Sequence, residues 1–276
     1  MGSAPFSRKR ISTNTIRKNN RALERKQKKV ISLELDTGAY QDFVDEALRL
    51  GTERISSYVC VANVHMCIEA YDDPEFARCV NGADLITPDG MPLAKAVRFL
   101  YGQQQDRVAG MDLLPSLLQE AEQRNLSVFF FGGQEETLDR TADYLKENYP
   151  KLQNVNYYSP PFRALSEEEE KEIVDRINQT AAQLVFVILG CPKQEKWMAR
   201  QKGKIQACML GIGGALPVLI GEQKRAPRWM QKASLEWLYR FAQEPKRLFK
   251  RYFYTNSKFL LLFAGAYLRK IFGRQK

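Results

Sequence analysis

Short apolar runs alternate with amphipathic stretches along most of this 276-residue chain, and this alternation limits the folds open to it. Seven runs are expected to form strands: 30–35, 58–62, 84–87, 127–131, 155–158, 184–189 and 205–210. The stretches between them have helical spacing, as at 40–50, 92–100, 113–124, 135–148, 166–180 and 194–201. Such alternation favours parallel strands, because each helix returns the chain to the same end of the sheet. The sequence predicts an α/β fold, a Rossmann-like, mainly parallel sheet with helices on both faces.

Glycines and polar residues follow five of the predicted strands. They are Asn63 and His65, Asp89 and Gly90, Gly132 and Gly133, Gly190 to Glu195, and Gly211 to Gly214. In a parallel sheet all these loops open on one edge, where glycines let a ligand approach the backbone and helix N-termini favour phosphate. We expect a nucleotide-sized site there that includes Gly132, Gly133 and Gly213. The alternative is that glycine merely ends these strands.

One acidic residue, Asp89, stands directly after the predicted strand 84–87, in the turn Pro88-Asp89-Gly90. Arg107 follows on the next loop. A carboxylate and a cation at this edge can act as a base and a charge-stabilising group for transfer of a group carried on phosphate. The alternative is that Asp89 only caps the following helix, since Asp is common before helices. This segment alone leaves both interpretations open.

Charge is distributed unevenly and divides the chain into three parts. Residues 1–29 carry 10 Lys/Arg against 1 acid, and we expect a mostly disordered basic arm. Residues 30–223 carry 18 against 29 and form the expected α/β catalytic domain. Residues 224–276 carry 14 against 2. Two basic ends on an acidic body point to an anionic partner, which is a membrane surface, a nucleic acid or a polyphosphate substrate.

The C-terminal part has the pattern of a basic amphipathic helical appendage. Apolar residues recur at roughly helical intervals, at Trp237, Phe241, Leu248, Tyr252, Phe259 and Phe263, and Pro245 is expected to start a new helix. Cations beside exposed aromatic residues suit a helix lying on an anionic leaflet, and the run 259–268 is too short to span a bilayer. The alternative is a stripe that packs on the body or on another subunit.

Several kinds of chemistry are disfavoured by composition. The chain has one histidine and five unpaired-looking cysteines, and no Asp-x-Asp pair follows a strand. We therefore expect neither a cofactor nor a bound metal, and a reducing, cytoplasmic location. Charge on a diphosphate would then be offset by Arg, Lys and backbone N–H groups. His65, at a strand end, is expected either to touch substrate or to be hydrogen-bonded structurally.

Read together, these segments resemble the WecG/TagA/CpsF glycosyltransferase family over roughly residues 30–255. The matching pieces are ANVH at 62–65, ADLITPDGMP at 83–92, RVAGMDLLP at 107–115, FFFGG at 129–133, GCPKQEKW at 190–197, GIGGALPVLIG at 211–221, and RAPRWM with LEWLYRFAQEPKRL within 225–248. The resemblance implies an inverting transferase that moves an N-acetylhexosamine or hexose. The donor would be a UDP-sugar and the acceptor a polyprenyl-diphosphate-linked sugar on the inner face of the plasma membrane, for cell-surface polysaccharide or teichoic-acid-type synthesis.

The resemblance also implies roles for particular residues. Asp89 looks like the general base, Asn63 would help to hold the sugars, and Arg107 and Gln194 look like groups that contact sugar and diphosphate. Arg240 and Arg247 resemble cations that close over the site, and either Lys250 or Arg251 would be the next. Two positions depart from the family pattern: Val61 replaces a threonine and Pro217 an acid.

Other functions remain as alternatives. A basic nucleic-acid- or membrane-binding protein without catalysis would account for the two basic ends, but no RNA- or DNA-binding motif is present. A Rossmann-type dehydrogenase would need a G-x-G-x-x-G turn that opens a helix, and the chain lacks one. The sequence leaves open whether the chain forms a homo-oligomer.

Overall fold

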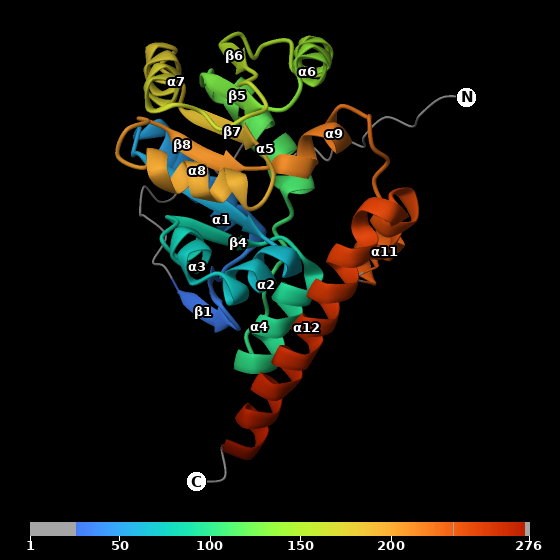
Figure 1. The fold of residues 1–276 in the computed structure, drawn as a ribbon. Coiled ribbons are helices and arrows are strands. Elements are labelled where there is room, and N and C mark those ends of the chain that lie inside the picture. The colour runs from blue at the N-terminus through green and yellow to red at the C-terminus, as the bar shows by residue number, and fades with distance from the viewer. Residues whose placement is uncertain (1–25, 234, 274–276) are drawn as a thin grey trace, which may run out of the picture.

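A computed structural model describes residues 26–233 and 235–273, and its centre is a six-stranded sheet (Figure 1). The strand order is β4-β3-β8-β7-β5-β6. The strands are β3 (Ser57–Ala62), β4 (Leu85–Pro88), β5 (Val128–Gly132), β6 (Val155–Tyr158), β7 (Leu184–Ile188) and β8 (Cys208–Gly211). Every neighbouring pair is parallel. The predicted parallel α/β sheet is confirmed, and all its carboxyl ends share one edge.

Alternate residues of each inner strand enter different cores, which is why the strands are apolar throughout. In β3, Cys60 joins one core and Val59 the other. In β5, Phe129 and Phe131 enter the first core and Phe130 the second. Both faces of the sheet are therefore covered, and the sheet is a rigid base for the loops at its carboxyl edge.

Helices cover both faces, as predicted. The core on one face receives side chains from α1 (Tyr40–Thr52), α5 (Gly110–Arg124), α6 (Glu135–Asn148) and α9 (Leu216–Leu219). The other core is filled from α2 (Val64–Asp72), α3 (Pro74–Asn81), α4 (Met91–Tyr101), α7 (Glu167–Gln179) and α8 (Lys193–Gln201). Ser166 caps α7 by accepting from the Glu169 N–H, in the capping box that its sequence indicates.

The prediction of one strand over 30–35 is wrong. The chain forms an antiparallel hairpin of β1 (Gln27–Val30) and β2 (Leu33–Asp36), which is a separate two-stranded sheet. Its turn places Ile31 at φ 58°, a conformation that branched residues rarely adopt, so the sequence carries no turn signal there. Residues 27–29, expected in the basic arm, belong to β1, and residues 1–25 of that arm lie outside the described residues.

Three helices follow the α/β body: α10 (Arg228–Lys232), α11 (Glu236–Gln243) and α12 (Pro245–Phe272). Pro245 begins the last helix, as predicted. Helix α12 runs along α2 and α4 (Figure 1), and it buries Leu248 and Phe259. The stripe predicted to face a membrane thus packs in part on the body.

A second set of apolar side chains on α12 remains exposed. It comprises Phe249, Phe253, Leu260, Leu261, Leu268, Ile271 and Phe272. These residues are not part of the apolar stripe predicted from the sequence. Their exposure depends on which side of α12 packs on α2 and α4. Within residues 26–233 and 235–273, no helix combines the length and the hydropathy that crossing a bilayer requires.

Candidate active site

Asp89 lies at the carboxyl edge of β4. Its N–H donates to the Ala62 carbonyl at 2.8 Å, which fixes the turn against the end of β3. Its Oδ1 accepts from the N–H of Gly110, the first residue of α5, at 3.1 Å. Helix α4 is instead preceded by Gly90, whose position has no side-chain cap. Asp89 therefore does not cap the helix that follows it, and the capping alternative is wrong for α4.

Burial makes the Asp89 carboxyl an unusually strong base for an aspartate. It raises the pKa of Asp89 to about 6, while the positive charges of Arg107 and Arg240 oppose the rise and Glu236 adds to it. A carboxylate with a pKa near 6 is still ionised at neutral pH and accepts a proton more readily than a solvated Asp. These are the properties that a general base needs.

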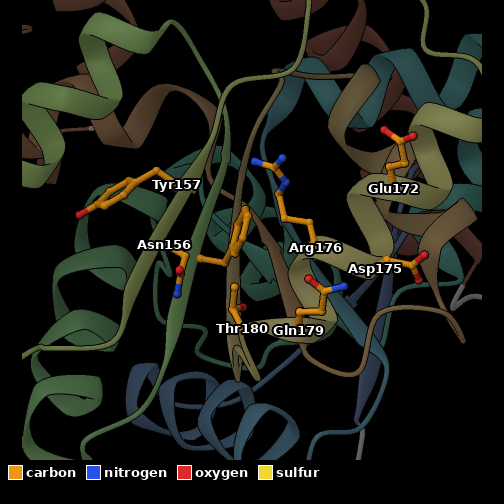
Figure 2. A pocket seen from close by; sticks show the side chains of 8 residues that line it. Asn156, Tyr157, Glu172, Asp175, Arg176, Gln179 and Thr180 are labelled. Atoms are coloured by element: carbon orange, nitrogen blue, oxygen red, sulfur yellow. The ribbon is translucent and has the colours of Figure 1, made fainter.

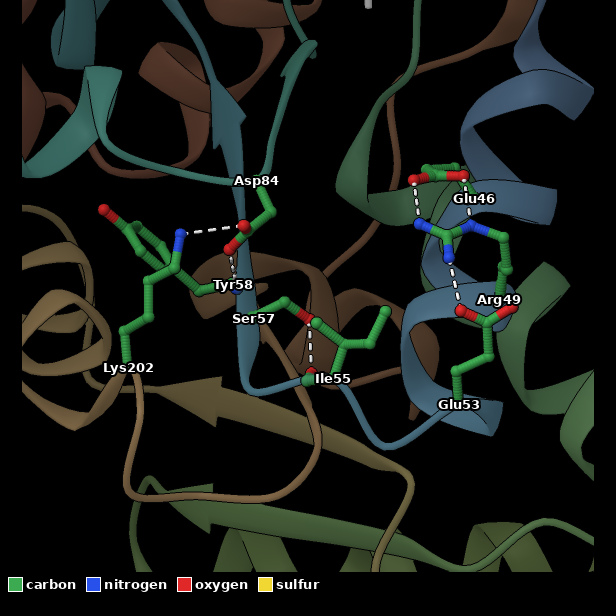
Figure 3. A network of polar contacts seen from close by, with 8 residues as sticks. All are labelled: Glu46, Arg49, Glu53, Ile55, Ser57, Tyr58, Asp84 and Lys202. Atoms are coloured by element: carbon green, nitrogen blue, oxygen red, sulfur yellow. Dashed lines mark hydrogen bonds and ion pairs between the residues drawn. The ribbon is translucent and has the colours of Figure 1, made fainter. Parts of the chain in front are cut away.

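Asp84, at the opposite end of β4, has a different role (Figure 3). Its carboxylate accepts from the Tyr58 N–H at 3.0 Å and from Lys202 Nζ at 2.7 Å. These contacts join β3, β4 and the end of α8 at the amino edge, away from the glycine loops. Of the two acids that flank β4, only Asp89 lies at the carboxyl edge of the sheet.

Arg107 lies beside Asp89 and is already paired with two other carboxylates. Its Nη1 donates to Glu236 Oε2 at 2.5 Å, and its Nη2 donates to Asp112 Oδ2 at 3.0 Å. Arg225 Nη2 lies 2.7 Å from the other Asp112 oxygen. The loop between α4 and α5, helix α5, the segment before α10, and helix α11 thus meet in one charge cluster.

Asn63 and His65 stand at the start of α2, next to this loop. Asn63 Oδ1 accepts from the Met66 N–H at 3.1 Å, and a Cβ on Gly90 would lie 3.9 Å from Asn63 Cβ. Burial and the charge of Arg251 lower the pKa of His65 to about 4, so this imidazole is neutral at neutral pH. Arg251 therefore lies closer to the site than Lys250, which is exposed.

The glycine loop after β8 packs on Gln194. Gln194 Oε1 accepts from the Gly190 N–H at 3.2 Å, and a Cβ on Gly213 would lie 3.2 Å from the same oxygen. Arg240 Nη2 donates to the Gly214 carbonyl at 3.3 Å. Since Arg240 also acts on Asp89, the structure brings Gln194, Gly213 and Arg240 to the same region as the carboxylate.

Gly132 and Gly133 lie further along the same edge. Gly132 is the last residue of β5 and Gly133 follows it, and β5 is four strand spacings or roughly 20 Å from β4. Both have positive φ, and Ser159 Oγ donates to the Gly133 carbonyl at 2.7 Å. Their contacts are with the ends of β6 and β7, so they can bind only a part of a substrate remote from Asp89. Arg247 lies near the start of α12, and its side chain is outside the described part of the chain.

Four charged residues of this region were not predicted: Asp112, Glu195, Arg225 and Glu236. Glu195 is fully buried, and burial raises its pKa to about 7 although the hydrogen bond from Gln194 Nε2 lowers it. The sequence did contain an indication of Glu195, because it is an acid next to Gln194 in the segment that follows β7. The signal for Glu236 was a rare acid, one of two, in the basic segment 224–276.

A cavity of about 850 Å³ lies elsewhere, between the edge strand β6 and α7 (Figure 2). It is lined by Phe129, Asn156, Tyr157, Glu172, Asp175, Arg176, Gln179 and Thr180. None of the predicted site residues lines it. Among the described residues, no group of three or more His, Cys, Asp or Glu side chains is arranged to hold a metal ion.

A doubly wound sheet with a partly buried carboxylate and arginines at its carboxyl edge is an architecture suited to group transfer from a phosphate-linked donor. Comparison with known proteins gives the class: the protein is a glycosyltransferase. Residues 28–273 match the Glycosyl transferase WecG/TagA/CpsF family, and the chain belongs to that family. The resemblance predicted for residues 30–255 is confirmed, and the match continues through all of α12.

One curated relative is the N-acetylglucosaminyldiphosphoundecaprenol N-acetyl-beta-D-mannosaminyltransferase of Bacillus spizizenii (strain ATCC 23059 / NRRL B-14472 / W23). The two sequences are 30% identical over 216 residues, which is 75% of this chain and 82% of the relative. The similarity therefore extends over most of both proteins.

The two glycines after β5 should differ in their tolerance of a side chain. Both Gly132→Ala and Gly133→Ala put a Cβ at positive φ, at a cost of roughly 1–2 kcal/mol. Only at Gly132 would the Cβ also lie 2.9 Å from the Ile188 carbonyl oxygen, which adds about 1–3 kcal/mol. Urea unfolding should show the larger loss of stability for Gly132→Ala, and equal losses would contradict this packing.

Proposed function

We propose that this protein is an inverting glycosyltransferase that moves an N-acetylhexosamine or hexose from a UDP-sugar to a polyprenyl-diphosphate-linked sugar. The product would enter a cell-surface polysaccharide or a teichoic-acid-type polymer. The observation that carries the proposal is the partly buried Asp89 carboxylate at the carboxyl edge of β4, with Arg107 and Arg240 beside it. The named relative supports the acceptor class, since its own name describes a diphosphoundecaprenol-linked sugar.

The chemistry requires one base. The acceptor hydroxyl oxygen attacks the anomeric carbon from the face opposite the UDP, and its proton passes to the Asp89 carboxylate. The bond between the anomeric carbon and the UDP oxygen breaks, and UDP leaves with the electron pair. A single displacement of this kind inverts the anomeric centre, whereas retention would need a second displacement. Asn63, at the next strand end, is placed to orient the sugar hydroxyls.

The leaving diphosphate needs positive charge. Arg240, which donates to the Gly214 carbonyl, is the cation that supplies it, and the family resemblance implies Arg247 as the second. Backbone N–H groups of the glycine loops add oriented dipoles. We propose that these groups, with Gln194, bind the donor diphosphate without a divalent ion, and that Gly132 and Gly133 bind its remote nucleoside part.

The acceptor is held in a membrane, so the enzyme must reach the lipid surface. The exposed side chains of Phe249, Phe253 and Leu261 on α12 are accompanied by Lys250. Apolar side chains beside cations favour binding to an anionic leaflet. We propose a peripheral location on the inner face of the plasma membrane. There α11 and α12 bring Arg240 over the site. The enzyme would act there as a monomer or as a homo-oligomer.

Asp89→Asn tests the base. The amide fits the same space but accepts a proton very poorly, so kcat should fall at least ~10²-fold with unfolding behaviour close to that of the original protein. UDP release with a lipid-linked acceptor measures the turnover. A fully folded Asp89→Asn enzyme with normal turnover would remove Asp89 from this role.

In the original protein kcat/KM should fall as the pH drops through about 6, because Asp89 becomes protonated. The same measurement of UDP release, repeated across a range of pH, checks this prediction.

The donor class can be tested without the acceptor. UDP should raise the melting temperature of the enzyme more than GDP or CMP, and added EDTA should leave the shift unchanged. Arg240→Ala should reduce the UDP-induced shift, because the diphosphate loses a cation. A shift that depends on Mg²⁺ would overturn the metal-independent mechanism, and a shift specific to another nucleotide would overturn the donor.

Membrane contact through α12 is tested by Phe249→Ser combined with Phe253→Ser. Both side chains are more than half exposed, so the fold should be retained. In the bound state these two phenyl groups would be buried in the lipid, at roughly 1.5–3 kcal/mol each. Their loss should therefore weaken binding to anionic vesicles, measured by sedimentation, at least ~10-fold. Phe162→Ser is the matched control, because Phe162 is 82% exposed and lies outside α12. Equal vesicle binding by all three proteins would contradict the proposed surface.

A further inference from the structure

Glu236 is an acid in an otherwise basic segment, and the structure joins it to the base through one guanidinium. It is the first residue of α11, and its Oε2 accepts from Arg107 Nη1 at 2.5 Å. The two residues are 129 positions apart in sequence. Both side chains are largely shielded, with Arg107 13% exposed and Glu236 17% exposed.

Fold stability alone does not account for this pair. Desolvation offsets much of the attraction between buried charges, so a shielded ion pair is weak evidence for stabilisation. In addition, Glu236 Oε1 is buried and has no hydrogen-bond partner within residues 26–233 and 235–273, which is itself unfavourable. An apolar contact at this point would dock α11 at a lower cost. The pair is better explained by an effect on its neighbour, Asp89.

The charged groups around Asp89 come from four elements. The loop after α4 supplies Arg107, α11 supplies Glu236 and Arg240, and α5 supplies Asp112, which also pairs with Arg225. His65 at the start of α2 is neutral at neutral pH and adds no charge. Asp89 itself accepts only from the Gly110 N–H among the hydrogen bonds of the described residues.

The guanidinium of Arg107 is held by two carboxylates, with Nη1 donating to Glu236 and Nη2 donating to Asp112. Among the described residues, no hydrogen bond joins either of these nitrogens to Asp89. A direct pair between Arg107 and Asp89 would hold the Asp89 carboxylate in its charged form and make it a poorer proton acceptor. The negative charge of Glu236 acts in the opposite direction.

We propose that Glu236 is a positioning residue of the transfer reaction, which keeps Asp89 an effective base by holding the neighbouring guanidinium of Arg107. This inference rests on the proposed function, in which Asp89 accepts the proton of the acceptor hydroxyl. Because Glu236 belongs to α11, the strength of the base depends on the docking of that helix. Glu236 contributes charge and geometry, and it does not exchange a proton with the substrate.

The test is the pH dependence of kcat/KM in Glu236→Gln. Removing the negative charge frees Arg107 to pair with Asp89. The acid limb of the pH profile, where kcat/KM falls as Asp89 is protonated, should then move to lower pH by about half a unit or more. The rate at neutral pH should fall about 3- to 10-fold, because the base is weaker. Glu222→Gln is the matched control: Glu222 pairs with Arg140 at 3.3 Å, outside the site, and its limb and rate should not change.

A purely structural role would lower the rate without moving the limb, and that result overturns the proposal. Glu236→Asp keeps the charge and should keep the limb in place. If Glu236→Gln does not fold, Asp112→Asn removes the other partner of Arg107. Its limb should then move in the same direction, and an unmoved limb overturns the proposal.

Asp89→Asn separates this inference from the proposed function. Normal turnover in that variant means that Asp89 is not the base and the proposed function fails first. An inactive Asp89→Asn together with an unmoved limb in Glu236→Gln means that only the inference about Glu236 fails.

Discussion

The pairing of β3 with strands on both sides sets the position of the polar groups at the carboxyl edge. Ala62 aligns with Pro88 of β4, and Cys60 aligns with Gly211 of β8. Asn63, Asp89 and the glycine loop after β8 therefore end up beside one another, although they come from segments far apart in the chain. All six residues of β3 are buried, so a shift in register would expose apolar surface as well as separate these groups.

Burial of charge is the second constraint, and it favours function over stability. Glu195 is fully buried and Asp89 is partly buried, and burial raises the pKa of each carboxyl toward neutrality. Neither forms an ion pair among the described residues; Asp89 accepts from the Gly110 N–H, and Glu195 accepts from Gln194 Nε2. Such groups cost folding free energy, and active sites are where proteins retain them. Arg107, by contrast, is paired with two carboxylates, those of Glu236 and Asp112, which fix its position in the site.

The C-terminal helices combine two roles that the sequence presented as alternatives. Helix α12 packs Leu248 and Phe259 onto the body while Phe249 and Phe253 stay exposed, so one helix is both docked and available to a surface. Its docking also carries α11, whose Glu236 and Arg240 face Asp89 and the glycine loop. A link of this kind connects the state of the appendage to the strength of the base.

The sequence by itself determined the parallel α/β fold, most strand and helix positions, the place of Asp89 after β4 and the start of α12 at Pro245. These follow from local rules, namely apolar periodicity and the residues that end strands and begin helices. Only the tertiary structure decided that 27–36 form a hairpin, which face of α12 is covered, and that Arg107 pairs with Asp112 and Glu236. All three features depend on how the elements come together. The hairpin has a turn without a typical turn residue, α12 can pack on more than one side, and the ion pairs join segments that are distant in the chain. No short stretch of sequence specifies these outcomes.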